Sequence, residues 1–216
     1  MNMMLPKIAE SGLVAIIRGI DKNYLLSAVD ALMEGGCNTV EITCDTPSAI
    51  EMIDTLKENF KNDLIIGAGT VLDRQTARLA ILAGAQFILM PHLSVDVIEI
   101  CNLYGKDVVP GVMTPTEITQ ALQLGCKMVK IFPASILGAR YFTNILKPIA
   151  QIQMMAVGGI NISNAADYLR AGAVALGVGK NLINKEILER GEYSEIIAKT
   201  REYLRIICEV KGNIAR

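Results

Sequence analysis

Short apolar runs alternate with longer segments of helical periodicity along nearly the whole chain, and this alternation constrains the fold more than any other feature. The runs are rich in β-branched residues and almost continuously apolar, as is typical of strands buried on both faces of a parallel sheet. Eight strands that are each followed by a helix predict an α/β protein, a (β/α)8 TIM barrel forming one domain over residues 1–216. The eight runs are Leu13–Ile17, Thr39–Thr43, Leu64–Gly67, Phe87–Met90, Asp107–Pro110, Met128–Phe132, Met154–Val157 and Val174–Val178.

The segments between the runs carry the spacing of helices that bury one face. Glycines such as Gly84 and Gly172 stand just before the next run, where a helix ends in the left-handed conformation, and Asp73 and Thr114-Pro115 suit helix starts. The expected helices are Tyr24–Glu34, Ser48–Asn59, Arg74–Leu82, Val95–Leu103, Pro115–Leu124, Arg140–Ala150, Asn164–Arg170 and a last helix from Ser194 to about Val210, which would cover one face or pack on a neighbour.

The rival architecture is a doubly wound open sheet. Such a sheet usually has fewer strands than eight at this length, and its G-x-G-x-x-G fingerprint does not follow the first run. No linker, low-complexity tract or charge run suggests a second domain. These observations favour the closed barrel.

Composition narrows the class of partner. Apolar residues make up 51% of the chain and charged residues 20%, which argues against disorder, and 21 basic against 22 acidic residues leave a net charge of −1. That balance provides no basic surface for nucleic acid and no anchor for a membrane. Lys7 and Glu10 interrupt the start of the chain where a signal peptide would be apolar, and five cysteines without a C-x-x-C pair indicate reduced thiols. We therefore expect a cytoplasmic protein with a small-molecule partner.

Two charged residues lie inside apolar runs, at the strand ends where barrels carry their chemistry. Lys130 is surrounded by apolar neighbours, so burial should lower its pKa and supply a neutral amine that can form a Schiff base with a carbonyl. Glu41 is a lone acid in Thr39–Thr43 that can remove and return a proton if its pKa is raised. The alternative for both residues is an internal salt bridge, and proximity alone would not separate the two interpretations.

Glycine-rich segments follow three of the runs. They are Gly67–Thr70, the Gly158-Gly159 pair and Gly177–Lys180. Because barrels often bind phosphate after strands seven and eight, the last two segments favour an anion site to which Lys180 adds charge, although plain tight turns remain the alternative.

Arg18 and His92 are the other polar candidates. Arg18 closes the first run and suits a carboxylate or phosphate, unless it is simply a surface arginine. His92 is the only histidine and has no second ligand motif nearby, so we expect no metal site.

Five motifs stand in order between Leu13 and Leu182. They are Val14–Gly19, Val40–Thr43, Gly67–Val71, Val129–Ala134 and Val157–Ile160. With these motifs the chain resembles the bacterial class I aldolases that cleave 2-keto-3-deoxy-6-phospho sugar acids and 4-hydroxy-2-oxoglutarate.

The resemblance implies a role for each site residue. Lys130 would form the Schiff base with the keto acid, and Glu41 would shuttle protons between the intermediates. Arg18 and Thr70 would contact substrate, and Phe132 would line the site. The remaining positions fall where the family holds phosphate, and they are Gly158, Gly159 and Gly179, with Lys180 as a further candidate contact.

The resemblance also implies the reaction and the assembly. The products would be pyruvate and glyceraldehyde 3-phosphate, as in the Entner–Doudoroff pathway, or pyruvate and glyoxylate. The family needs no metal or other cofactor and usually forms a homotrimer.

Three departures from the family pattern bear on the aldehyde half of the substrate. Asp45 stands where some gluconate-type members have arginine, Lys180 stands where serine is common, and Ala156-Val157 looks more like the 6-phosphogalactonate branch.

Two other functions stay open on the residues alone. One is a non-covalent sugar-phosphate isomerase or epimerase with Glu41 as its base, and the other is a barrel that only binds a phosphorylated metabolite.

Overall fold

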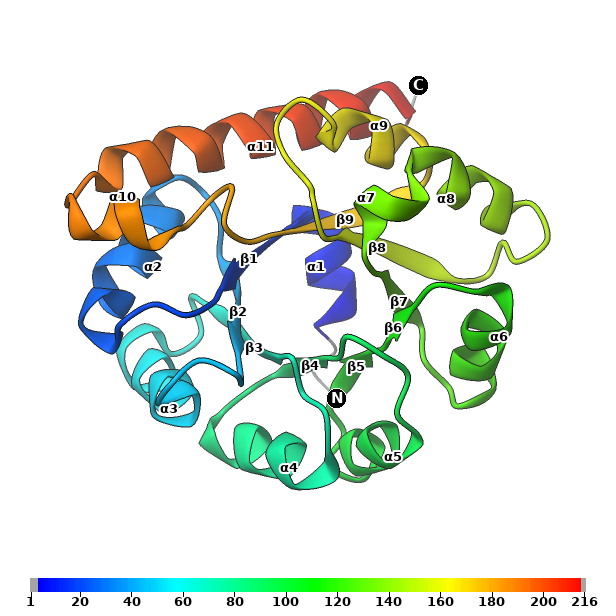
Figure 1. Cartoon of the computed structure of the whole chain (residues 1–216), viewed down its shortest axis with the longest axis horizontal. Coiled ribbons are helices and arrows are strands. Elements are labelled where there is room, and N and C mark those ends of the chain that lie inside the picture. Colours follow the sequence, from blue (N-terminus) through cyan, green and yellow to red (C-terminus); the bar gives the residue numbers. More distant parts are fainter. Residues whose placement is uncertain (1–3, 215–216) are drawn as a thin grey trace.

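The computed structural model describes residues 4–214, in which a ring of parallel strands is surrounded by helices (Figure 1). The strands follow the order β5-β4-β3-β2-β1-β9-β8-β7-β6. Each is buried over most of its length, in agreement with the continuous apolar runs. The strands are β1 (Leu13–Ile17), β2 (Thr39–Thr43), β3 (Ile65–Gly69), β4 (Phe87–Leu89), β5 (Asp107–Val109), β6 (Gly111–Val112), β7 (Met128–Ile131), β8 (Gln153–Val157) and β9 (Ala173–Val178).

The fifth predicted run, Asp107–Pro110, corresponds to β5, and a further strand that was not predicted, β6, follows Pro110. The two strands are separate because proline has no N–H to donate to a ladder. β5 pairs with β4, and β6 pairs with β7. The Lys130 N–H donates to the Pro110 carbonyl at 2.8 Å, so the interruption is itself bonded to β7. β5 and β6 are the two ends of the strand order, and Pro110 alone connects them in the chain. The ring of strands therefore closes, which confirms the barrel and excludes the open sheet.

The helices surround the ring and confirm most of the predicted segments. Asp73 caps α4 by accepting from the Thr76 N–H at 2.7 Å, and Thr114 with Glu117 forms a capping box at the start of α6. The helices after β1 are η1 (Lys22–Tyr24), α2 (Leu25–Glu34), α3 (Ala49–Phe60), α4 (Arg74–Ala83), α5 (Val95–Leu103), α6 (Pro115–Gln123), α7 (Ala134–Leu137), α8 (Ala139–Leu146), α9 (Ala165–Arg170), α10 (Lys185–Glu189) and α11 (Tyr193–Ile214).

Some helices differ from the prediction. α8 ends at Leu146 rather than Ala150, because Pro148 has no N–H to continue the helical hydrogen bonds, although Lys147 itself keeps a helical conformation. α7, α10 and an N-terminal helix, α1 (Leu5–Ser11), were not predicted, because they are too short to show helical periodicity.

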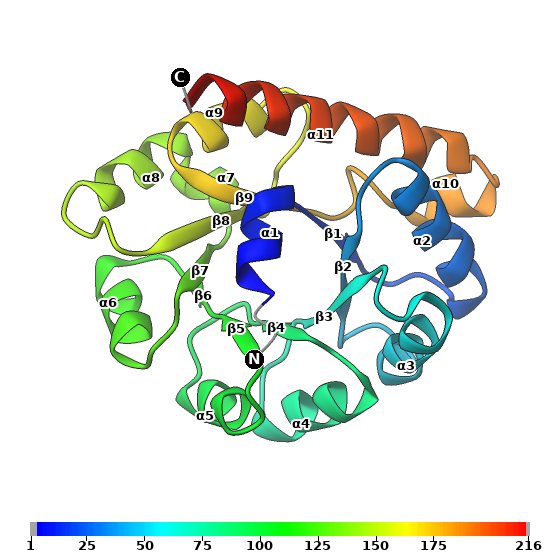
Figure 2. The same cartoon turned by 180° about the vertical axis from the view of Figure 1, so that it is seen from behind.

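Helix α1 closes the amino-terminal end of the barrel (Figure 2). Leu5 and Ile8 are buried in the inner cluster with Phe87. The Asp107 carboxylate accepts from the Leu5 N–H at 3.1 Å, and Lys211 from α11 donates to the Glu10 carbonyl at 3.2 Å. The other end, where the strands terminate, is therefore the end at which a ligand can enter. Across residues 4–214, no helix has the length and apolarity to cross a bilayer.

Candidate active site

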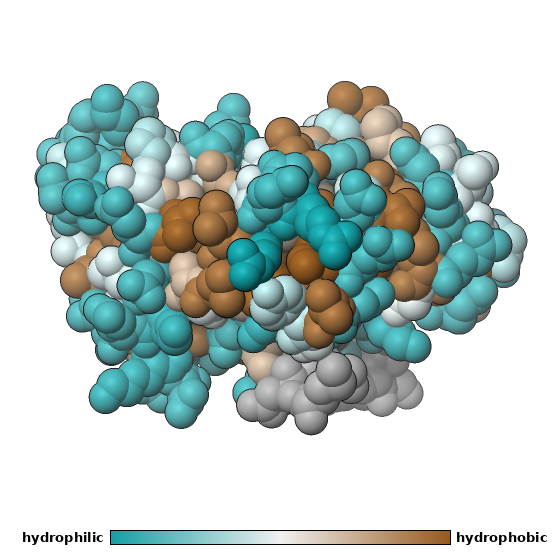
Figure 3. All heavy atoms as spheres, turned by 90° about the horizontal axis from the view of Figure 1, so that it is seen from below, coloured by the Kyte–Doolittle hydropathy of each residue, from teal (hydrophilic) through white to brown (hydrophobic). Residues whose placement is uncertain are grey.

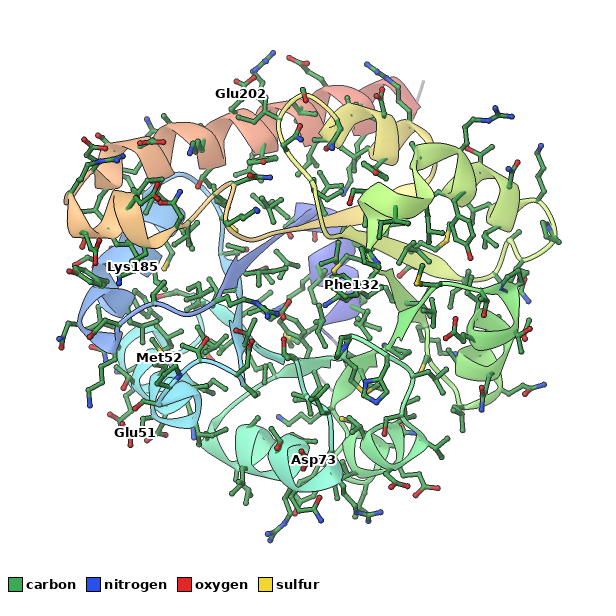
Figure 4. The ribbon with its side chains drawn as sticks, viewed as in Figure 1. Glu51, Met52, Asp73, Phe132, Lys185 and Glu202 are labelled. Carbon is green, nitrogen blue, oxygen red and sulfur yellow. The ribbon has the colours of Figure 1, made fainter. Side chains whose placement is uncertain are left out.

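A cavity of about 420 Å³ lies at the carboxyl ends of the strands, between the loops that follow β1, β7, β8 and β9. Figure 4 shows Phe132 near the centre of this end of the barrel. Every site residue proposed from the sequence lines the cavity except Thr70. Those that do are Arg18, Glu41, Lys130, Phe132, Gly158, Gly159, Gly179 and Lys180.

Lys130 enters the cavity from β7 with 3% of its surface exposed. Its Nζ lies 4.8 Å from the centroid of the Phe132 ring, within the range of a cation–π contact. Burial lowers the pKa of Lys130, and the nearby Arg18 charge lowers it further, while Glu41 acts in the opposite direction. A lysine in this environment provides more of the neutral, nucleophilic amine than a solvated one.

Glu41 enters from β2 and is only 1% exposed. Burial raises the pKa of its carboxyl group, against the opposing effects of Lys130 and Arg18. Neither carboxylate oxygen finds a hydrogen-bond donor among the residues that the structure describes. Within those same residues, no ion pair joins Glu41 to Lys130. The two side chains therefore do not form the internal salt bridge that was the alternative interpretation. Both remain free to interact with a ligand in the cavity.

Gly69 makes the room that Glu41 occupies. A Cβ atom at position 69 would lie 1.5 Å from Glu41 Oε1, which is far inside any real contact. Gly69 is the register partner of Thr43, two residues beyond Glu41 on β2. Gly69 therefore allows close packing around a carboxylate, whereas Gly67 allows close packing of the Phe87 ring, which a Cβ atom at position 67 would approach to 2.2 Å.

Arg18 is held between two acceptors at the mouth of the cavity. Its Nη2 donates to Thr70 Oγ1 at 2.7 Å, and its Nη1 donates to Asp45 Oδ2 at 2.8 Å. Thr70 thus connects to the cavity through Arg18 without lining it. Asp45 was noted from the sequence only as a departure from the family, because nothing in its local pattern shows its pairing with a residue 27 positions away.

The glycine loops after β8 and β9 also line the cavity, and β9 is the neighbour of β1, the strand that leads into Arg18. Gly158 and Gly159 both have positive φ, and a Cβ atom on Gly159 would lie 2.5 Å from Ser135 Oγ. Gly179 and the exposed Lys180 line the cavity from the neighbouring loop. This is the side at which a phosphate would meet bare backbone and a positive charge.

The β9–α10 loop also brings residues that the sequence reasoning missed. Asn181 donates through Nδ2 to the Ile160 carbonyl at 2.6 Å and joins the two glycine loops. Asn184 caps α10 by accepting from the Ile187 N–H at 3.0 Å, and Lys185 lines the cavity beside it. Their only sequence signal is their position just after the last strand.

His92 is exposed and lies outside the residues that line the cavity. No group of three or more His, Cys, Asp or Glu side chains within residues 4–214 is arranged to hold a metal ion.

Comparisons with known proteins show the family of the chain. The family model described as "Aldolase: KDPG and KHG aldolase" matches residues 5–199. The 2-dehydro-3-deoxy-phosphogluconate aldolase of Haemophilus influenzae is 32% identical over 95% of this chain and 97% of its own length. The 2-dehydro-3-deoxy-6-phosphogalactonate aldolase of Escherichia coli is 35% identical over 79% of this chain and 83% of its own.

Among solved structures, the KDPG aldolase of Legionella pneumophila, with pyruvate captured as a covalent carbinolamine, superposes with a TM-score of 0.84 at 26% identity. The match covers 90% of this chain and 94% of that one. On the extent of the family match and of these identities, the chain belongs to the KDPG and KHG aldolase family.

Proposed function

We propose that this protein is a class I lyase that cleaves a 2-keto-3-deoxy-6-phospho sugar acid to pyruvate and glyceraldehyde 3-phosphate through a Schiff base on Lys130. The observation that carries the proposal is a buried amine that faces a buried carboxylate in one cavity without being paired to it. Burial moves the pKa of each group toward its neutral form, which suits a nucleophile and a proton carrier.

The reaction begins when the neutral Lys130 Nζ attacks C2 of the keto acid. Proton transfer and loss of water convert the carbinolamine to a protonated imine. Glu41 then removes the proton of the C4 hydroxyl, the C3–C4 bond breaks, and its electrons move into the imine to give an enamine and the free aldehyde. Glu41 returns the proton to C3, and water hydrolyses the resulting imine to release pyruvate and restore the amine.

The groups that line the cavity suit the two charged ends of the substrate. Arg18, held by Thr70, offers a guanidinium to the keto-acid carboxylate. Gly158, Gly159 and Gly179, together with Lys180, offer the phosphate site, and Phe132 lines the region between the ends.

The proposal covers substrates of the gluconate and galactonate types, because relatives of both names match the chain. It also includes cleavage of 4-hydroxy-2-oxoglutarate to pyruvate and glyoxylate. Val157 lines the cavity and belongs to the Ala-Val pair that resembles the galactonate branch. Comparison of kcat/KM for the three substrates identifies the preferred one.

The deciding experiment is reductive trapping. The protein is incubated with pyruvate and borohydride, digested, and analysed by mass spectrometry for a reduced adduct, with Lys130→Ala as the control. An adduct on Lys130 in the parent protein, absent from the folded variant, is the expected result. A folded parent protein that acquires no adduct would favour the non-covalent isomerase, epimerase or binding-barrel alternatives.

We also propose that the protein works as a cytoplasmic homotrimer. The face over α4 and α5 carries several exposed apolar residues (Figure 3), and an exposed apolar face of this kind favours self-association. These residues are Leu72, Leu79, Leu82, Val95, Leu103 and Tyr104. Light scattering during size-exclusion chromatography should give the mass of three chains of 23.4 kDa each, and the mass of one chain would contradict the proposal.

A further inference from the structure

Three successive strand ends converge on the Arg18 guanidinium. Arg18 follows β1, Asp45 follows β2 and Thr70 follows β3. Arg18 donates to Asp45 at 2.8 Å and to Thr70 at 2.7 Å, so both of its terminal nitrogens are engaged. The side chains of Arg18 and Asp45 are 54% and 45% exposed, and a pair this exposed contributes little to stability. The pair therefore matters more for where it holds the Arg18 guanidinium than for the stability of the fold.

Buried hydroxyls fix the loop that carries Asp45. Thr43 and Thr46 are buried, and their Oγ1 atoms lie 2.9 Å apart. Thr46 Oγ1 also accepts from the N–H of Gly19 at 2.9 Å, which ties this loop to the residue directly after Arg18. The carboxylate and the guanidinium are thus held on two loops that are joined to each other.

The second acceptor, Thr70, has an unusual backbone conformation. Thr70 has a φ of 53°, a left-handed conformation that is rare for a β-branched residue. Such conformations cluster at functional sites, where the surroundings impose them. Here the conformation accompanies a hydroxyl placed at hydrogen-bond distance from Arg18.

Arg18 lines the cavity, whereas Asp45 and Thr70 do not. A guanidinium has more N–H groups than Asp45 and Thr70 accept from, and the remaining ones are available to a ligand. We propose that Asp45 is a positioning residue, which together with Thr70 orients Arg18 toward the carboxylate of the keto-acid substrate. This inference rests on the proposed aldolase function and extends it to a residue at which the chain departs from the family pattern.

Asp45 has a second effect, through its charge. Apart from burial, the groups that act on the pKa of Glu41 are Lys130 on β7, Arg18 after β1 and Asp45 after β2, and of these only Asp45 raises it. Cys44 lies in the same loop, and burial with the charges of Glu41 and Asp45 raises the pKa of its thiol to about 12, so it stays neutral. Removal of the Asp45 charge should therefore lower the pKa of Glu41 and move the acid limb of the pH–rate profile to lower pH.

The test compares Asp45→Ala with Asp45→Asn in steady-state cleavage. Asparagine keeps an oxygen that accepts from Arg18, so its KM should stay within about twofold, whereas alanine should raise KM roughly five- to tenfold. Both variants lack the charge, so both should shift the acid limb downward by about half a pH unit. Asp96→Asn, an exposed carboxylate in the first turn of α5, is the matched control and should change neither quantity.

An unchanged KM in folded Asp45→Ala, or an unmoved acid limb in Asp45→Asn, would overturn the inference. Trapping with pyruvate and borohydride accompanies each variant. An adduct on Lys130 with unaltered kinetics removes only the role of Asp45, whereas no adduct in the parent protein removes the aldolase mechanism itself.

Discussion

At the scale of single residues, the proposed function depends on two ionisable side chains that burial makes costly to charge. Lys130 is 3% exposed and Glu41 is 1% exposed, and the pKa of each is shifted toward its neutral form. Two ionisable groups that interact in one cavity titrate as a pair. Burial favours the neutral amine that Schiff-base formation requires.

Glu41→Gln tests the proton carrier separately from the nucleophile. The amide cannot accept the C4 proton, so kcat for cleavage should fall by about 10² to 10⁴. Lys130 keeps its amine, so borohydride should still attach pyruvate to it. Near-normal turnover in a folded Glu41→Gln protein would assign the proton transfer to another group.

The same variant should change how stability depends on pH. The pKa of Glu41 is higher in the folded protein than in the unfolded chain, so its contribution is fully present below the unfolded pKa and is lost as pH rises through the folded pKa. Glu41→Gln avoids that loss. Urea unfolding between pH 5 and about 9 should therefore show the variant gaining on the parent protein as pH increases, and a difference that is constant with pH would contradict the prediction.

Lys180→Ala tests the phosphate end of the cavity. Removal of the positive charge should raise KM for phosphorylated sugar acids about three- to tenfold while leaving KM for 4-hydroxy-2-oxoglutarate nearly unchanged. Parallel steady-state measurements with both substrates check this. Equal effects on the two would place Lys180 outside the phosphate site.

At the scale of secondary-structure elements, the neighbouring strand shapes the site as much as the strand that carries the reacting group. Glu41 on β2 has room for its carboxylate because β3 ends in Gly69. In Gly69→Ala the new methyl group must displace the carboxylate, so kcat should fall at least about tenfold with the barrel still folded. Gly212→Ala, in α11 where a Cβ atom meets nothing within 4 Å, is the control and should retain full activity.

At the scale of the whole molecule, one end of the barrel is closed by packing and the other end holds the cavity. Helix α1 and its buried Ile8 close one end, whereas Lys130 and Glu41 line the cavity at the other. Ile8→Ala should lower the free energy of unfolding by about 2 to 4 kcal/mol, because it leaves a cavity in the inner cluster. KM should not change. Denaturant unfolding and kinetics on the same sample test both statements, and an altered KM would show that the two ends are coupled.

Sequence alone was sufficient for the alternation of elements and for singling out the two buried charged residues that line the cavity. The apolar runs predicted the strands because burial on both faces imposes apolar residues locally. Lys130 and Glu41 stood out because a charge inside such a run is costly and is usually retained for a reason. The short helices α1, α7 and α10 escaped notice because so few residues carry little periodicity, whereas α9, which is equally short, was predicted because it lies between two apolar runs and Gly172 follows it.

Only the tertiary structure decided which distant residues meet. The interruption at Pro110 becomes ring closure because β5 before it and β6 after it bond to different neighbours. Gly69 becomes the space for Glu41 only through the register of β2 and β3, and Arg18 finds Asp45 and Thr70 only because three strand ends lie side by side. Local sequence records how deeply each residue is buried, whereas pairings across the barrel depend on register and closure, which are properties of the assembled sheet.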